Sequence, residues 1–304
     1  MRIGGFRSED GRARFLAAYE AAMAELEQPT TAIDVATSFG SVRAYRWQGE
    51  QATAPPILLL PGQTAGTPMW AENLADFRAS GRTIVAFDAL GDAGLSVQHV
   101  PLRSLDDQAR WVEEALVALG HQRVHSVGHS FGGATAANHA LRHPGRIASL
   151  ALLEPAFTLG WPPASTFGWA ALATLPVPQS WRERALAAIG GVPVEEVRTA
   201  GPIGRLIAVA SETFVSRLPT PRPLSTAQLE SLCVTTYVAI AGRRSLAGGP
   251  RAAARARSHL PDATVEIWPE ATHSLPMQVR EPLAERLRSF WTAADRSAAR
   301  PTGV

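Results

Sequence analysis

The sequence contains no lysine, so all 29 of its permanently cationic side chains are arginines. They are scattered among 27 acidic residues, and the formal net charge is only +2. A long basic run, which is typical of proteins that bind nucleic acid or acidic lipid, is missing. We therefore expect neither nucleic acid nor a membrane as a partner.

Cysteine and long apolar runs are scarce as well. Cys233 is the single cysteine, which excludes an internal disulfide and gives no sign of an oxidising compartment. No segment is long and apolar enough to span a bilayer, and the first ten residues lack the apolar stretch of a secretory signal. The sequence thus predicts a cytoplasmic protein, and its 46% of hydrophobic residues suffices for a large core.

Short apolar runs alternate with helical patterns along most of the chain. An antiparallel pair of strands is expected first, after an amphipathic leader helix over 15–26, and buried parallel strands follow. This order predicts an α/β fold with a mostly parallel central sheet flanked by helices. The expected strands span residues 32–38, 42–47, 57–60, 83–87, 124–127, 147–153, 235–241 and 264–268.

One long segment interrupts this alternation and is rich in Trp, Phe, Pro and Leu. We predict a helical cap over residues 156–232, inserted into a core domain formed by residues 1–155 and 233–304. The cap's aromatic side chains either form a small core of their own or face the cleft, where they would favour an apolar or bulky substrate. They are Phe157, Trp161, Phe167, Trp169 and Trp181.

Two helix ends can also be predicted. The segment from Ser104 to Asp107 resembles a capping box that starts a helix, with apolar residues recurring on one face after it. The tail from Ala294 to Val304 is expected to be frayed.

The most specific motif is Gly128-His129-Ser130-Phe131-Gly132, which follows an apolar strand and precedes an alanine-rich helix. A nucleophilic serine needs such a sharp strand-to-helix turn, because its hydroxyl must project freely beside a helix N-terminus that favours negative charge. Gly128 and Gly132 leave room where backbones come close. Ser130 is therefore the predicted nucleophile.

With this motif, the chain resembles the α/β-hydrolase superfamily over nearly its whole length. The segment 58–64, Leu-Leu-Leu-Pro-Gly-Gln-Thr, is similar to the family's loop after the third strand, with Pro61 in place of the usual histidine. The resemblance implies an oxyanion hole formed by the backbone amides of Gln63 and Phe131. Asp88 lies in a segment similar to another family loop, and there it is expected to organise the loop.

The resemblance also indicates the base. His273 follows the last predicted strand and precedes the final helix, which is the position of the family's general base. The other seven histidines lie in helices, loops or strands without that context, so we expect structural or solvent-exposed roles for them.

The acid departs from the family's usual pattern. Where most relatives carry an aspartate, this chain reads Ala-Gly-Arg-Arg-Ser over 241–245, and no Asp or Glu occurs from 231 to 261. Glu154 directly follows the strand after the nucleophile helix, at the sheet edge where such folds place their sites, and some haloalkane dehalogenases carry their acid there. Glu154 is thus the predicted acid. Alternatively, it binds loop backbone or a substrate group while Ser130 and His273 act as a dyad.

These residues predict a serine hydrolase that cleaves a carboxylic ester, thioester or lactone of a small molecule through an acyl-enzyme, with no metal and no organic cofactor. Acyl transfer, carbon–carbon bond hydrolysis or cyclisation in a biosynthetic pathway would use the same residues. A non-catalytic ligand-binding homologue is the other alternative, because the usual aspartate is missing near Ser245. A homo-oligomer is compatible with the sequence.

Overall fold

The computed structural model describes residues 3–51, 53–175 and 177–298, and within them a sheet of nine strands forms the centre of the molecule. Six neighbouring strands run parallel and carry the apolar runs of the sequence. This arrangement confirms the predicted α/β fold with a mostly parallel sheet. In sheet order, the six strands are β11 (Ala263–Trp268), β10 (Thr236–Ala241), β8 (Ile147–Leu153), β7 (Val124–His129), β4 (Ile57–Leu60) and β5 (Ile84–Phe87).

An antiparallel hairpin completes the sheet beside β5. Its strands are β2 (Thr31–Thr37) and β3 (Gly40–Trp47), and β3 also pairs antiparallel with β5. A two-residue strand, β6 (Val97–Gln98), pairs with β3 at the turn. The sequence did not predict β6, because two residues are too few to show a period.

Helices cover both faces of the sheet because successive side chains of a strand point in opposite directions. In β4, Leu58 and Leu60 contribute to the core of one face, whereas Ile57 and Leu59 contribute to the core of the other. The helices on the first face are α3 (Leu105–Ala118), α4 (Phe131–Arg142) and α10 (Gly249–His259). Those packed with the second core are α2 (Ala71–Arg78), α11 (Leu275–Gln278) and α12 (Arg280–Ala298).

The two predictions about helix ends have different outcomes. The capping box of α3 is confirmed, since the Ser104 hydroxyl accepts the Asp107 amide N–H and the Asp107 carboxylate accepts the Ser104 amide N–H. The frayed tail is wrong as far as residue 298, because α12 continues to Ala298 and buries Ala294. Residues 299–304 of that predicted tail lie outside the described residues.

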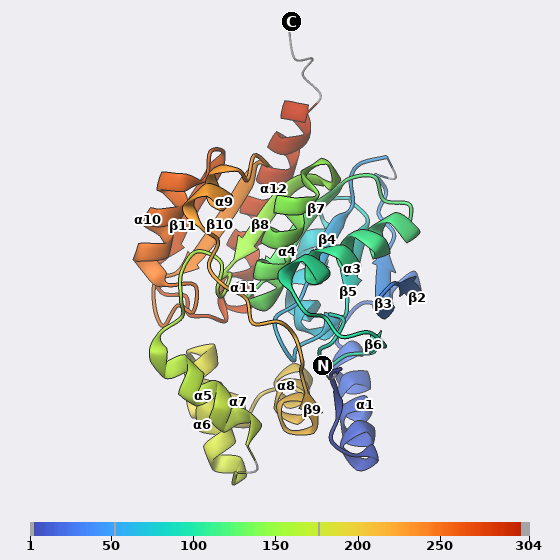
Figure 1. The fold of residues 1–304 in the computed structure, drawn as a ribbon, viewed down its shortest axis with the longest axis vertical. Helices are drawn as coiled ribbons and strands as arrows, with labels where there is room; N and C mark the ends of the chain where they lie inside the picture. Colours follow the sequence, from blue (N-terminus) through green and yellow to red (C-terminus); the bar gives the residue numbers. More distant parts are fainter. Residues whose placement is uncertain (1–2, 52, 176, 299–304) are drawn as a thin grey trace, which may run out of the picture.

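Between β8 and β10 the chain forms mainly helices, and α5 to α8 lie at one end of the molecule (Figure 1). The division into a core and a cap over 156–232 stays a prediction. Near its predicted end, Leu224, Leu229 and Leu232 pack into the core of the first sheet face. The elements of the insertion are α5 (Ala164–Thr174), α6 (Gln179–Gly190), α7 (Val194–Arg198), α8 (Pro202–Thr213), β9 (Phe214–Val215) and α9 (Thr226–Glu230).

The N-terminal leader packs against this insertion. Strand β1 (Gly5–Phe6) pairs with β9, and helix α1 (Glu9–Met23) lies beside α8 in Figure 1. Arg14 of α1 donates two hydrogen bonds to the Glu212 carboxylate of α8, at 3.0 and 3.1 Å. The leader helix was predicted, but its periodicity could not identify the surface that it contacts.

Within the described residues, every helix is too short or too polar to cross a membrane.

Candidate active site

Ser130 lies at the sharp turn between β7 and α4. Its φ is 54° and its ψ is −119°, a conformation that side chains other than glycine rarely adopt. The flanking glycines allow close backbone contacts: a Cβ on Gly128 would lie 2.3 Å from the carbonyl oxygen of Gly132, and one on Gly132 would lie 2.1 Å from that of Leu60. The turn therefore packs directly onto the end of β4, and the serine is held away from the helix axis.

His273 contacts the serine hydroxyl. Its Nε2 is 2.9 Å from the Ser130 Oγ, and both side chains are buried. His273 follows β11 and lies just before α11, as the sequence predicts. With Nδ1 carrying the proton, Nε2 accepts the serine O–H and can take its proton.

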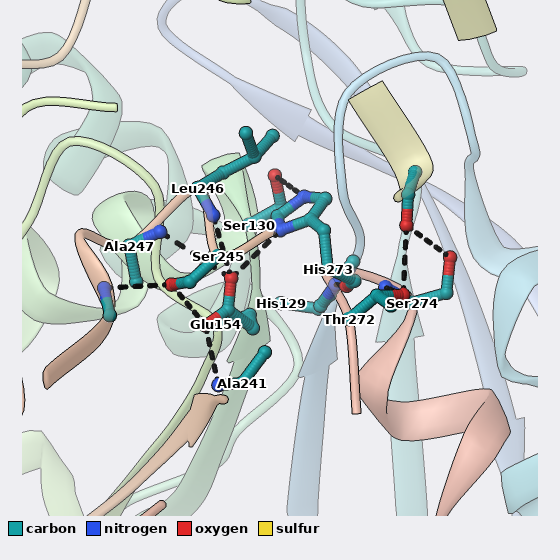
Figure 2. Close-up of polar contacts among 12 residues, drawn as sticks. His129, Ser130, Glu154, Ala241, Ser245, Leu246, Ala247, Thr272, His273 and Ser274 are labelled. Atoms are coloured by element: carbon teal, nitrogen blue, oxygen red, sulfur yellow. Dashed lines mark hydrogen bonds and ion pairs between the residues drawn. The ribbon is translucent and has the colours of Figure 1, made fainter. Parts of the chain in front are cut away.

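Glu154 completes a continuous line of polar contacts. Its carboxylate is fully buried after β8, and Oε2 is 3.1 Å from the Nδ1 of His273 (Figure 2). The structure therefore brings together Ser130, His273 and Glu154, three residues distant in sequence. The parallel strands that precede them are neighbours or near neighbours in the sheet, and their carboxyl ends meet at one edge.

The Glu154 carboxylate also binds loop backbone, which was the alternative to a role beside His273. The Ala241 amide donates to Oε1 at 2.7 Å, and the amides of Leu246 and Ala247 donate to Oε2 at 3.0 and 3.4 Å. Both interactions thus occur at once. Hydrogen bonds of this kind compensate a buried carboxylate for the water that it loses.

Ser245 has a function that sequence reasoning missed. It stands where the family resemblance leads one to expect an aspartate, and its hydroxyl donates to Glu154 Oε1 at 2.7 Å while accepting the Gly249 amide N–H at 3.0 Å. Figure 2 shows it beside the carboxylate. The serine at the position of the expected aspartate therefore binds Glu154, the predicted acid that follows β8. The sequence signal for this contact was the combination of a serine at 245 with a glutamate directly after β8.

His129, the variable residue of the elbow motif, packs against His273. The two imidazole rings are 4.9 Å apart, and Nε2 of His129 lies 2.9 Å from the backbone carbonyl of His273. Burial, together with His273, lowers the pKa of His129 to about 3, so this ring stays neutral at ordinary pH and donates its Nε2–H. It supports the His273 backbone and does not compete as the base.

Several other predicted structural histidines form hydrogen bonds away from this site. His125 contacts the Ser149 hydroxyl, His139 contacts Glu113, and His259 contacts Glu230.

The predicted oxyanion donors border one small cavity. Gln63 and Phe131 both line it, and neither amide donates a hydrogen bond to another described residue. On either side of Gln63, the Gly62 amide donates to the Met69 sulfur at 3.1 Å and the Thr64 amide donates to Asp92 at 2.7 Å. The loop is thus fixed around Gln63, while the role of the two amides stays a prediction.

Asp88 links the loops behind this site. Its buried carboxylate accepts the amide N–H of Thr67 at 2.8 Å and of Leu95 at 2.7 Å, and the Tyr19 hydroxyl of α1 at 2.8 Å. These contacts fit the loop-organising role expected of it.

The aromatic side chains of the insertion divide into two groups. Phe157 forms edge contacts with Phe131, Trp161 and Phe167, with ring centroids 5.5 to 5.9 Å apart. Because Phe131 directly follows Ser130, this cluster connects the surface with the candidate site. Trp169 and Trp181 form no such ring contact within the described residues. Both are exposed, as Trp161 and Phe167 also are, so the aromatic side chains do not form a closed core.

Known proteins resemble the chain in sequence. A family model described as alpha/beta hydrolase fold matches residues 55–194. The chain is 35% identical over 124 residues to the uncharacterized carboxylesterase nap, and 28% identical over 151 residues to carboxylesterase YbfK, both of Bacillus subtilis (strain 168). The alignments cover 41% and 50% of this chain. They cover 40% and 50% of the relatives, so the chain spans half or less of the length of these curated relatives.

The resemblance in structure is wider. Naproxen esterase (carboxylesterase NP) from Bacillus subtilis superposes with a TM-score of 0.83 at 24% identity, covering 93% of this chain and 98% of that one. A likeness at this identity shows the fold. Together with the family model, it confirms the resemblance that the motifs indicated: the chain has the α/β-hydrolase fold.

We expect Gly132→Ala to destabilise the protein, because the new methyl group would overlap the backbone oxygens of Leu60 and Pro61. Overpacking of this kind costs about 1–3 kcal/mol, which urea unfolding would detect as a lower midpoint. Gly168→Ala is the matched control, since that position in α5 has open space and alanine favours a helix by up to about 1 kcal/mol. Equal midpoints for the two variants would contradict the close packing of the turn on β4.

Glu154→Gln should lower turnover of short-chain 4-nitrophenyl esters by about 10³ to 10⁴, as loss of the buried triad carboxylate does in other serine enzymes. The hydrogen-bond partners of this carboxylate among the described residues all donate to it, so the glutamine NH₂ would face N–H or O–H groups in either orientation.

Ser245→Ala is the control for this substitution, because it removes one donor and keeps the charge; we expect a loss of about tenfold or less. Circular dichroism would verify that both variants fold. Near-normal turnover of Glu154→Gln would assign the chemistry to a Ser130 and His273 dyad.

Proposed function

We propose that the protein is a serine hydrolase that cleaves a carboxylic ester, thioester or lactone of a small molecule through an acyl-enzyme. One observation carries the proposal: hydrogen bonds run without interruption from the Ser130 hydroxyl through His273 to the buried Glu154 carboxylate. This is the arrangement that activates a serine for attack on a carbonyl carbon. Carboxylesterases among the proteins that resemble the chain support the same class of substrate.

In the proposed reaction, His273 Nε2 takes the proton of Ser130 while Oγ attacks the carbonyl carbon. The amides of Gln63 and Phe131 donate to the oxyanion that forms, and they have no other described acceptor to give up. His273 then gives the proton to the leaving oxygen or sulfur. Water, activated by the same imidazole, releases the acid and restores the serine.

Glu154 serves this cycle by fixing the His273 ring and by stabilising the imidazolium that forms twice in each turnover. Because both of its oxygens are also held by loop donors, the carboxylate has one orientation available. The imidazole therefore needs no reorganisation of its partner when it becomes charged.

The aromatic cluster around Phe157 favours an apolar or bulky group in the substrate. In this proposal, the helices of residues 156–232 are the cap that covers the cleft, and no metal or organic cofactor takes part. A cytoplasmic location and a homo-oligomeric state remain predictions that accompany it.

A fluorophosphonate probe tests the nucleophile directly. The wild-type protein should be labelled stoichiometrically, with the adduct on Ser130 by peptide mass spectrometry, and should release 4-nitrophenol from short-chain esters. The Ser130→Ala variant should bind no probe and lose ester hydrolysis by at least about 10³-fold.

Ser126→Ala is a control for this experiment, because that serine is buried in β7 before the turn and should not affect labelling. Labelling without ester hydrolysis would favour acyl transfer, carbon–carbon bond hydrolysis or cyclisation on the same residues. Absence of both labelling and hydrolysis would favour a ligand-binding protein that retains the hydrolase fold.

A further inference from the structure

A small cavity lies beside the two predicted oxyanion donors. Gln63 and Phe131 form part of its wall, α3 and α4 contribute further residues, and the segment 218–221 after β9 closes it. Figure 1 shows that segment running from β9 toward α9. Most of the lining is apolar, including Trp111 and Leu218, but Asp92 also lines it. Burying a carboxylate among apolar side chains costs free energy, so its presence here indicates a role.

Asp92 is only 3% exposed, and its two oxygens differ in their partners. Oδ2 accepts the Thr64 amide N–H at 2.7 Å, whereas Oδ1 is buried without a hydrogen-bond partner among the described residues. A buried carboxylate oxygen without a donor is destabilising. Burial accordingly raises the pKa of Asp92 to about 6, although the carboxylate is still mainly ionised at neutral pH.

Gln108 supplies a second polar group to the same cavity. Its Oε1 accepts the Trp111 indole N–H at 2.8 Å, which fixes the amide so that its NH₂ group is directed away from the indole. That NH₂ group donates to no other described side chain or backbone. The cavity is thus lined by a carboxylate oxygen without a donor among the described residues, by the side-chain amide of Gln108, and by apolar walls.

We propose that this cavity is a specificity subsite for a hydroxyl group of the substrate, and that Asp92 accepts the hydroxyl's hydrogen bond. A hydroxyl fits both groups, because it can donate to Asp92 Oδ1 while it accepts from Gln108. The inference rests on the proposed hydrolase function and adds a substrate class to it, namely esters that carry a hydroxyl group near the scissile carbonyl.

The position of the cavity explains why the hydroxyl must be near the carbonyl. Gln63 and Phe131 line the cavity and also flank the place of the substrate carbonyl in the proposed reaction. A group that enters the cavity is therefore attached within a few bonds of that carbonyl. The Thr64 amide holds Asp92 in advance of binding, so little conformational freedom is lost when the hydroxyl arrives.

Three esters of nearly equal shape test the subsite on the acyl side: ethyl 3-hydroxybutanoate, ethyl 3-oxobutanoate and ethyl 3-methylbutanoate. The first can donate, the second can only accept, and the third does neither. The 2-hydroxypropyl, 2-oxopropyl and 2-methylpropyl esters of butanoic acid form the matching series on the alcohol side. In at least one series, kcat/KM of the wild-type protein for the hydroxy ester should exceed both analogues by at least about tenfold.

Asp92→Asn should change this order. The amide oxygen can still accept the Thr64 N–H, but an NH₂ group then replaces the free oxygen and donates to an oxo ester. We expect the ratio of kcat/KM for the oxo ester to that for the hydroxy ester to rise by at least about tenfold. Asp106→Asn is the matched control, because this α3 carboxylate is exposed and its ratios should stay at the wild-type values.

Each outcome has one interpretation. Hydrolysis by the wild-type protein without a preference for the hydroxy ester in either series would overturn the subsite, whether or not Asp92→Asn folds. An unchanged ratio in a folded Asp92→Asn protein would also overturn it, and would assign Asp92 to the loop alone. If Ser130 is not labelled by the fluorophosphonate and no ester is cleaved, the proposed function itself fails and the subsite falls with it.

Discussion

The burial of one charge, the carboxylate of Glu154, is the constraint on which the site depends. A fully buried carboxylate is tolerated only where donors replace the water that it has lost, and here the amides of Ala241, Leu246 and Ala247, the Ser245 hydroxyl and the His273 imidazole do so. These donors belong to the end of β10, to the chain that follows it, and to the chain after β11. Satisfying the charge therefore brings the ends of three strands together and fixes the position of His273.

The same constraint explains how the acid can come from a different strand than in most relatives. Strands β8 and β10 are neighbours in the sheet, with Leu153 paired to Ala239, so their ends open onto the same space. A carboxylate from either end can approach the Nδ1 of His273. With the longer glutamate on β8, a small hydroxyl residue at 245 fits against it, whereas a second carboxylate there would introduce repulsion between like charges.

Features that depend on residues close together in the sequence could be predicted. The β7 strand, Ser130 and α4 are consecutive, and the capping box of α3 spans four residues, so periodicity and motifs were sufficient for both. Glu154 required more, since it followed from an absence around residue 245 combined with the order of the strands. Its contact with His273 joins residues 119 positions apart, and a pattern can suggest such a contact without measuring it.

Features that depend on tertiary packing alone could not be predicted. The cavity that contains Asp92 is formed by the end of β4, the loops after β4 and β5, α3, α4 and the chain after β9, segments with no shared sequence signal. The two-residue strands β1, β6 and β9 are too short for any period, and β1 pairs with a strand more than two hundred residues away. The contact of His129 with the His273 backbone could not be predicted either, because the two residues come together only in the fold.

The leader helix α1 limits how the insertion can move relative to the sheet. Through Arg14 it is joined to α8 of the insertion, and through Tyr19 it reaches Asp88 in a loop of the sheet, so it ties these two parts of the molecule together. The α8 side of the insertion is thereby held in place relative to the sheet. The segment before α1 also reaches α5, because Arg7 donates to the Thr174 carbonyl oxygen at 3.1 Å, so a movement of the insertion away from the sheet would have to break bonds to the leader.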